Sequence, residues 1–191
     1  MMRSPASEVP ALKHEGGHVL RAIVLIAMGT AALTLSAYAQ IPLWPVKLSM
    51  QSFVVFILGF LYGPSLAVVT VAVYICAGAI GLPVFQSGAG PSYLLGPTGG
   101  FLVGFLGAAY VTGFATEKWG ALSRPIVAAG SALLATIVVF VPGLVWLAVL
   151  FGAQKAMALG LSPFLPGAVL KLALATASIP LIRAARSKIT K

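Results

Sequence analysis

Two long stretches without a charged side chain constrain this chain more than any other feature. No Lys, Arg, Asp or Glu occurs between Leu48 and Thr116, or between Pro125 and Gln154. Both stretches are far longer than the ~20 apolar residues that cross a bilayer. Only 8% of the residues are charged and 60% are apolar, whereas soluble domains carry about 25% charged residues. We therefore predict an all-α, polytopic integral membrane protein.

Prolines, glycines and charged segments divide the chain into candidate spans. We expect spans at about 20–39, 49–62, 65–80, 101–115, 125–150 and 163–182. The second and third could instead form one long tilted span, although Gly63-Pro64 would break such a helix. Pro125 suits a first helical position. Residues 40–47 are predicted to form a loop at the interface, and Gly81–Gly100 is too irregular for a helix.

The positions of the positive charges set the orientation. With six spans and the N-terminus inside, nine Lys and Arg residues are cytoplasmic and two, Lys47 and Lys155, are outside. Five spans would move four C-terminal cations outside, against the tendency of cytoplasmic loops to retain positive charge. We therefore predict a bundle of six transmembrane helices with both termini cytoplasmic. Residues 1–19 would form a polar cytoplasmic tail, 20–185 the membrane domain that binds substrate, and 186–191 a basic cytoplasmic tail.

Several classes of function are excluded by what the sequence lacks. The formal charge of +9 does not indicate nucleic-acid binding, because the basic residues lie in short segments between apolar runs. No phosphate-binding P-loop motif occurs. The three acids, Glu8, Glu15 and Glu117, all lie outside the predicted spans, so no carboxylate is available for acid–base chemistry in the membrane. We expect a protein that is not an enzyme and has no cofactor.

Metal binding is also disfavoured. The one cysteine, Cys76, can form neither an intrachain disulfide nor a cysteine metal site. His14 and His18 are spaced to share a helix face, but no third ligand is nearby and a solvated tail is the simpler interpretation.

Lys171 is the exceptional residue of the predicted spans. It lies about eight residues into the last span, and no acid in any span can pair with it. A charged lysine at such depth is costly and usually marks a ligand or ion path. The alternative is that its long stem extends to the outer interface. If it points inward, its partners must be backbone carbonyls, polar side chains or an arriving ligand.

The glycine-rich segment 81–100 belongs to the same outer side. Irregular backbone at membrane depth is tolerated only where it is buried in protein or lines a cavity. Its glycines allow the backbone to approach a flat ligand, and Phe85 and Tyr93 supply apolar walls. A surface turn is the alternative, but twenty residues is long for one. Trp44 in the first outer loop can cover such a site, and Gln51 offers an amide that donates and accepts.

Four strings together resemble a known family. They are PVKLSMQSF at 45–53, YICAGAIGLPVF at 74–85, LLGPTGGFLVGF at 94–105 and PFLPGAVLK at 163–171. They resemble the BioY family, the biotin-binding S components of energy-coupling factor (ECF) vitamin transporters, over about residues 22–183. The resemblance implies high-affinity biotin binding and uptake across a bacterial cytoplasmic membrane. It also implies an outer-face pocket formed by the later helices and closed by the first and third outer loops.

The resemblance assigns roles to individual residues. The family pattern includes a lysine that contacts the ligand, and Lys171 occupies that position. Members often carry an aspartate where this chain has Ala168. Our hypothesis is that another acceptor, such as Gln51 or a loop carbonyl, binds the ureido N–H. The candidate substrate-binding residues are Trp44, Gln51, Tyr74, Phe85, Gly88, Tyr93, Gly96, Thr98, Gly99 and Lys171.

The resemblance also implies partners. In the S-component pattern, small residues on the first helix contact a transmembrane coupling protein, and Ala27 and Ala31 match that spacing. Two ATPase subunits would complete the transporter, whereas a member that acts alone could form a homo-oligomer. Membrane lipid is expected around the bundle. Two other functions stay open: an S component for another small vitamin, and a membrane scaffold subunit without a small ligand.

Overall fold

The described part of the chain is mostly helical, as predicted. The computed structural model describes residues 12–41, 48–86 and 88–189. The helices in this part of the chain are α1 (Leu12–Tyr38), α2 (Gln51–Tyr62), α3 (Pro64–Ala79), α4 (Pro91–Leu94), α5 (Gly99–Trp119), α6 (Pro125–Phe151), α7 (Ala153–Gly160), α8 (Leu165–Ala177) and α9 (Ile179–Ile189). A two-residue antiparallel pair, β1 (Gln40–Ile41) and β2 (Leu48–Ser49), joins α1 to α2.

The lengths and surfaces of the helices suit a membrane. Residues Gly17–Tyr38 of α1, all of α5 and all of α6 are long and apolar enough to cross one, and α8 with α9 forms a fourth candidate bent by 53°. Helices α2 and α3 are apolar but shorter. The outward face of α6 exposes apolar side chains along its whole length, including Ile126, Ile137 and Val149. Such a face is stable against lipid rather than water.

The helix boundaries differ from the predicted spans at both ends of the chain. Helix α1 begins at Leu12 rather than near residue 20, so a polar segment extends the first span. The last span is two helices, because α8 ends at Ala177 and α9 begins at Ile179. Pro180 cannot donate a helical hydrogen bond and its ring crowds the preceding turn. The Ser178 hydroxyl donates to the Leu174 carbonyl at 2.7 Å, a contact that also bends helices.

The intervening segments mostly follow the sequence pattern. Gly63 has a φ of +83° and separates α2 from α3, which confirms a break rather than one tilted span. The segment 81–98 is irregular apart from the one-turn helix α4. Lys155, expected in a loop, lies in the short helix α7.

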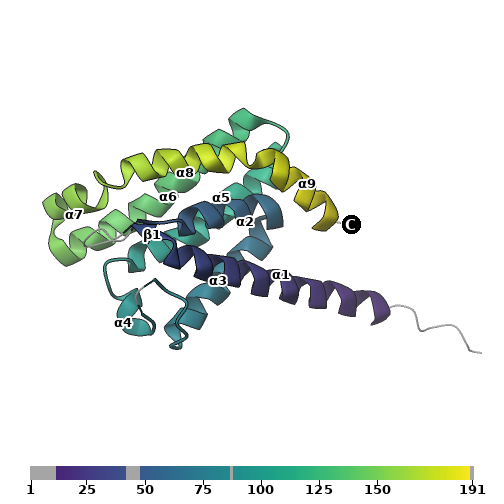
Figure 1. Cartoon of the computed structure of the whole chain (residues 1–191), viewed down its shortest axis with the longest axis horizontal. Helices are drawn as coiled ribbons and strands as arrows, with labels where there is room; N and C mark the ends of the chain where they lie inside the picture. The colour runs from purple at the N-terminus through teal and green to yellow at the C-terminus, as the bar shows by residue number, and fades with distance from the viewer. Residues whose placement is uncertain (1–11, 42–47, 87, 190–191) are drawn as a thin grey trace, which may run out of the picture.

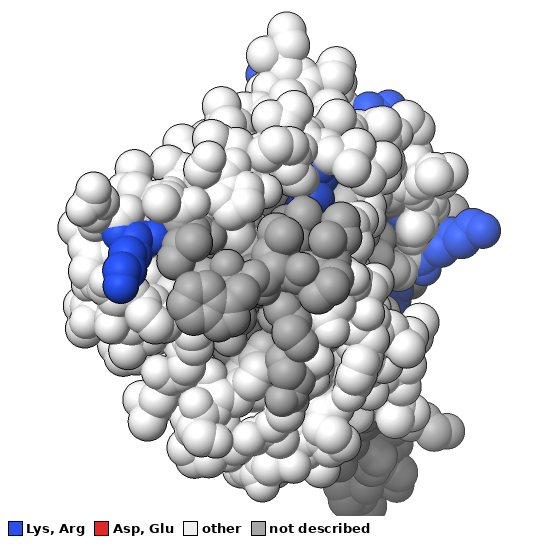
Figure 2. All heavy atoms as spheres, turned by 60° about the vertical axis from the view of Figure 1, so that its left-hand side comes forward, with Lys and Arg blue, Asp and Glu red and all other residues white. Residues whose placement is uncertain are grey.

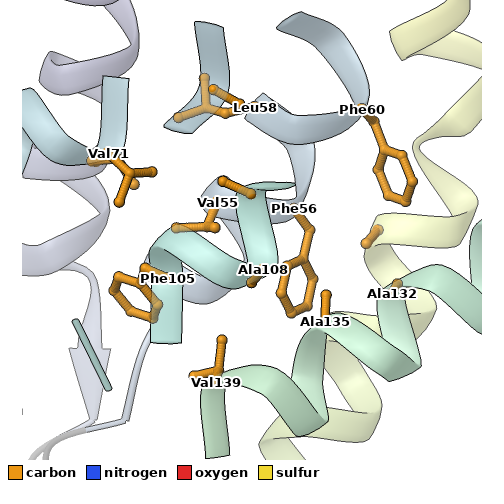
Figure 3. Close-up of a cluster of buried hydrophobic side chains, with 14 of the residues drawn as sticks. Val55, Phe56, Leu58, Phe60, Val71, Phe105, Ala108, Ala132, Ala135 and Val139 are labelled. Carbon is orange, nitrogen blue, oxygen red and sulfur yellow. The ribbon is translucent and has the colours of Figure 1, made fainter. Parts of the chain in front are cut away.

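Close packing of α5 against α6 forms the centre of the bundle. A Cβ at Gly104 would meet the backbone of Val139 at 2.7 Å. Ala108, one turn further along α5, is fully buried. Figure 3 shows Phe56 of α2 beside Ala108 of α5 and Ala135 of α6, so α2 packs over the α5–α6 pair. Small residues here allow the backbones to approach closely.

The two ends of the bundle differ in chemistry. Helix α9 and the first turns of α1 lie at one end, which we call the α9 end, and α7 with the β1–β2 pair lies at the other, the α7 end (Figure 1). At the α9 end, Arg186 donates to the Phe60 carbonyl at 2.9 Å and pairs with Glu117 at 3.5 Å. Arg183 donates to the Leu122 carbonyl. These contacts attach α9 to α2 and to the α5–α6 turn.

Candidate functional site

A pocket opens at the α7 end of the bundle. It lies among the first turns of α2, α5 and α8, the middle of α6 and the segment 81–98, and about 660 Å³ of empty space lies in it, counting the part open to solvent. Its apolar walls are Phe56, Phe101, Leu102, Phe105, Val139, Phe140 and Phe164. Its polar side chains belong to Ser49, Gln51, Ser52, Gln86, Tyr93, Thr98, Thr136 and Lys171.

Lys171 supplies positive charge to this pocket. Its side chain is only 8% exposed, and its Nζ donates to the Ser52 Oγ at 3.1 Å. The stem therefore does not extend to the interface, which was the alternative. Among the described residues Glu117 is the acid whose side chain is placed, and it is paired with Arg186 at the opposite end. No acidic side chain is visible among the described residues on the face seen in Figure 2, which looks toward the α7 end.

A cation held in an apolar pocket without a countercharge favours an anionic ligand. The desolvation of a buried charge is costly unless an opposite charge and hydrogen bonds compensate for it. Ser52 offers one neutral acceptor and leaves the charge uncompensated. A carboxylate that enters the pocket could complete the ion pair and bury its own apolar body against the phenylalanine walls.

Gln51 links the pocket wall to the structure behind it. Its Nε2 donates to the Tyr74 hydroxyl at 2.6 Å, and its Oε1 accepts from the Ser49 hydroxyl at 3.0 Å. The Tyr74 hydroxyl in turn donates to the Val84 carbonyl at 3.1 Å. Both ends of the Gln51 amide are therefore engaged within the protein. The Gln51 Oε1 therefore already accepts one hydrogen bond, and a ligand N–H would have to use its second lone pair.

Three aromatic rings pack together where the segment 81–98 meets α3. Phe85 packs edge-to-face on Tyr74 with ring centroids 5.4 Å apart, and it stacks on Tyr93 at 4.6 Å. Tyr93 lines the pocket, whereas Tyr74 and Phe85 are buried behind it. The Phe85 ring lies directly over Gly78, where any Cβ would collide with it. Tyr74 and Phe85 thus position the wall of the pocket without lining it.

The predicted glycines shape the loop rather than line the cavity. Gly88 is exposed and has a φ of +150°. The Gly96 carbonyl accepts from the Trp146 Nε1 at 2.9 Å, and Gly99 begins α5 against the Leu94 carbonyl. Thr98, between these glycines, does line the pocket. Trp44 lies outside the described residues.

The two residues predicted to contact a partner lie away from the pocket. Ala27 and Ala31 are both exposed on α1, one helical turn apart. A different small residue of α1, Gly29, faces inward, and a Cβ there would meet the Thr70 side chain. Sequence spacing alone did not separate the outward pair from this inward glycine.

Several lining residues escaped the sequence analysis. Ser52 follows Gln51 directly, but adjacent helical positions point to different faces, so its role beside Lys171 had no sequence signal. Gln86 lies in the segment that was singled out, yet only the three-dimensional path of that segment turns it inward. Ala168, where an acceptor was expected to be missing, does line the pocket and offers only a methyl group.

Comparisons with known proteins agree with the family resemblance and with the helical fold. A profile described as "BioY family" matches residues 5–188. The biotin transporter BioY of Thermotoga maritima is 33% identical over 159 residues, covering 82% of this chain and 92% of that protein. The probable biotin transporter BioY of Pyrococcus horikoshii is 32% identical over 154 residues, covering 80% of this chain and 90% of that protein.

A solved structure has the same fold. It is the S-component for biotin from an ECF-type ABC transporter, with a TM-score of 0.78 and 24% sequence identity. The match covers 88% of this chain and 93% of that one. At this identity the likeness establishes the helical architecture.

Proposed function

This chain belongs to the BioY family, and on that premise we propose that it takes up biotin as the substrate-binding S component of an ECF-type transporter. Relatives named as biotin transporters align over most of their length with this chain. Such a protein transports a ligand rather than transforming it, which agrees with the expectation that the chain is not an enzyme. The pocket at the α7 end is the proposed biotin site.

The composition of the pocket matches the chemistry of biotin. Biotin carries a carboxylate on an apolar chain and a fused ring pair that includes a cyclic urea. The phenylalanine walls offer apolar surface to the rings and chain, and Lys171 offers a cation to the carboxylate. The single observation that carries the proposal is the Lys171 ammonium, buried in the pocket with no acidic partner among the described residues.

Other residues serve the proposed site in different ways. Gln51, Tyr93 and Thr98 lie on the pocket wall. Tyr74 and Phe85 support that wall from behind, and Gly88, Gly96 and Gly99 set the path of the loop. Trp44, in the first outer loop, remains a proposed cover for the site.

The arrangement in the membrane is also part of the proposal. Helices α1, α2, α3, α5, α6 and the bent pair α8–α9 would be the six spans of a bacterial cytoplasmic membrane protein. Both termini would be cytoplasmic, at the α9 end, and the pocket would open to the outside. Arg21, Lys118, Arg124 and the cations of α9 support this orientation, because cytoplasmic segments retain positive charge. At the α7 end, the described residues include one cation that does not line the pocket, Lys155.

The exposed alanines of α1 are the proposed contact with an energising partner. Ala27 and Ala31 present a shallow apolar surface on which another membrane helix can pack closely. A coupling protein with two ATPase subunits would supply the ATP hydrolysis for which this chain has no motif. A homo-oligomer is the arrangement if the chain acts alone.

Biotin titration of the purified protein tests the proposal. The wild type should bind biotin more tightly than biotinamide, in which a neutral amide replaces the carboxylate. Lys171→Met should weaken biotin binding by about 100-fold, because a charged hydrogen bond is lost, and should remove the preference over biotinamide. Lys155→Met is the matched control, since Lys155 is exposed on α7 at the same end and does not line the pocket.

The result that would overturn the proposal is equally direct. If the wild type shows no saturable biotin binding, or if Lys171→Met binds biotin as the wild type does, the pocket is not a biotin site of this kind. A panel of other vitamins in the same assay would then identify a different ligand or none.

A further inference from the structure

Gln86 lines the pocket and carries a buried side-chain oxygen that makes no hydrogen bond to the described residues. The residue is only 7% exposed, and its Oε1 has no hydrogen-bond partner among the residues that the structure describes. Two other buried oxygens in the described part of the chain share this state, Thr30 Oγ1 and Gln40 Oε1, but neither residue lines the pocket. Buried polar atoms are nearly always paired, so an unpaired one beside a cavity points to a ligand.

The other strong polar groups of the pocket are already engaged. The Gln51 amide is bonded at both its nitrogen and its oxygen, to Tyr74 and Ser49. The Lys171 ammonium is a donor only, and the Ser52 hydroxyl accepts from it. Of the two carboxamides that line the pocket, Gln51 and Gln86, only Gln86 has an oxygen with no hydrogen-bond partner among the described residues.

The backbone of Gln86 is held in place although its side-chain oxygen is not. The Gln40 Nε2 contacts the Gln86 carbonyl at 3.5 Å. On the other side, Phe85 forms an isolated bridge with Gly88, and Val84 accepts from the Tyr74 hydroxyl. An acceptor that is fixed before the ligand arrives loses little entropy on binding.

We propose that the Gln86 Oε1 accepts an N–H of the cyclic urea of the ligand and makes Gln86 a specificity-determining residue. This inference rests on the proposed function, in which Lys171 binds the carboxylate. Gln86 comes from the segment 81–98 and Lys171 from α8, so two separate elements recognise two separate polar groups. A ligand with the same carboxylate chain but no urea N–H would leave the Gln86 oxygen unpaired.

Titrations with biotin and lipoate separate these two contacts. Lipoate has the same pentanoate chain as biotin and carries a dithiolane ring without any N–H. We would compare the wild type, Gln86→Met and Gln40→Met. Gln40 is the matched control, because it is also a glutamine with an unpaired buried oxygen, it touches Gln86 and it does not line the pocket.

Gln86→Met should bind biotin about tenfold more weakly, which corresponds to one lost hydrogen bond. Gln40→Met removes a contact to the loop but keeps the Gln86 side chain, so it should weaken biotin binding less than Gln86→Met does. Lipoate binding should change less than twofold in Gln86→Met. Without ligand, Gln86→Met should unfold at or above the wild-type temperature, because it removes an unpaired buried oxygen. A purely structural role for Gln86 predicts a lower temperature instead.

Three results would overturn the inference. If Gln86→Met binds biotin as the wild type does, Gln86 is not the acceptor, while the proposed function stands. If Gln40→Met loses as much affinity as Gln86→Met, the effect comes from disturbing the loop. If the wild type does not bind biotin at all, the proposed function fails and the role of Gln86 fails with it.

Discussion

At the scale of single residues, the site divides into polar atoms that are satisfied and polar atoms that are not. Gln51, Tyr74 and Val84 form a chain of hydrogen bonds behind the pocket wall. Lys171 and Gln86 line the cavity, and among the described residues the Lys171 ammonium has no acidic partner and the Gln86 Oε1 has no hydrogen-bond partner. The first group contributes to stability and the second to binding. This division predicts different consequences for substitutions in the two groups.

Tyr74→Phe should destabilise the protein even without ligand. It removes a fully buried hydroxyl and leaves the Gln51 Nε2 and the Val84 carbonyl without their partner. Such unsatisfied groups cost about 1–3 kcal/mol, which thermal unfolding in detergent can measure. Tyr38→Phe is the control, because the Tyr38 hydroxyl also bonds a carbonyl, that of Pro83, but is exposed. An equal loss of stability in both variants would mean that the buried hydrogen bonds behind the pocket wall do not contribute more than an exposed one.

Sequence reasoning could reach Lys171 but not Gln86, and the reason is physical. A lysine in an apolar run is conspicuous because burying its charge costs free energy, so such residues usually mark a functional site. A glutamine in a polar, glycine-rich loop has no such signature, because a solvated amide costs nothing. Only the fold shows that Gln86 is buried and without a partner. Similarly, Tyr74 was expected among the ligand contacts, whereas in the structure its hydroxyl accepts a hydrogen bond from the Gln51 Nε2.

At the scale of elements, the contact between α5 and α6 carries the architecture. Gly100 approaches the Pro142 carbonyl and Gly104 approaches Val139, so the two backbones nearly touch along one face. Where apolar lipid surrounds the bundle, such close packing replaces the hydrophobic effect as a source of helix association. The first turn of α5 and the middle of α6 both line the pocket. Their packing therefore also sets its width.

Gly104→Ala should lower stability while Gly130→Ala should not. A Cβ at position 104 would meet the Val139 backbone at 2.7 Å, whereas one at Gly130, within α6, meets no atom within 4 Å. Overpacking costs about 1–3 kcal/mol, and alanine is the better helix former by about 1 kcal/mol. Thermal unfolding of both variants checks this pair. Equal stability of the two variants would mean that the helices can separate without loss.

Helix boundaries could be predicted from the sequence where a single glycine or proline is enough to end or begin a helix. Gly63 separates α2 from α3, and Pro125 begins α6, as the sequence indicates. The division of the last span into α8 and α9 was missed, because apolar character continues through Ser178 and Pro180. The sequence analysis also did not predict that the basic residues near the C-terminus lie in a helix, α9. Their helix is held by contacts with distant partners, such as Arg186 with Phe60 and Glu117, which local patterns do not report.

At the scale of the whole molecule, the two ends of the bundle are chemically opposite. The α9 end carries Arg21, Lys118, Arg124 and the cations of α9, and the α7 end carries the pocket. The first turns of α1 and the end of α9 lie together at the first of these ends (Figure 1). An even number of membrane crossings follows if both of these ends of the chain face one compartment.

Cysteine labelling in whole cells tests this orientation. In a Cys76→Ala background, Ser92→Cys and Ser162→Cys would mark the α7 end, and Ser123→Cys and Ser187→Cys the α9 end; all four serines are exposed. Because positive segments stay in the cytoplasm, an impermeant maleimide should label the first pair in intact cells and the second pair only after permeabilisation. Labelling of all four in detergent confirms that each site is reactive. The reverse pattern would place the pocket in the cytoplasm, and labelling of one member of each pair in intact cells would contradict the assignment of α5, α6 and the α8–α9 pair as three crossings. In the reverse case the pocket could not receive biotin from outside, so uptake would need a different route through the bundle.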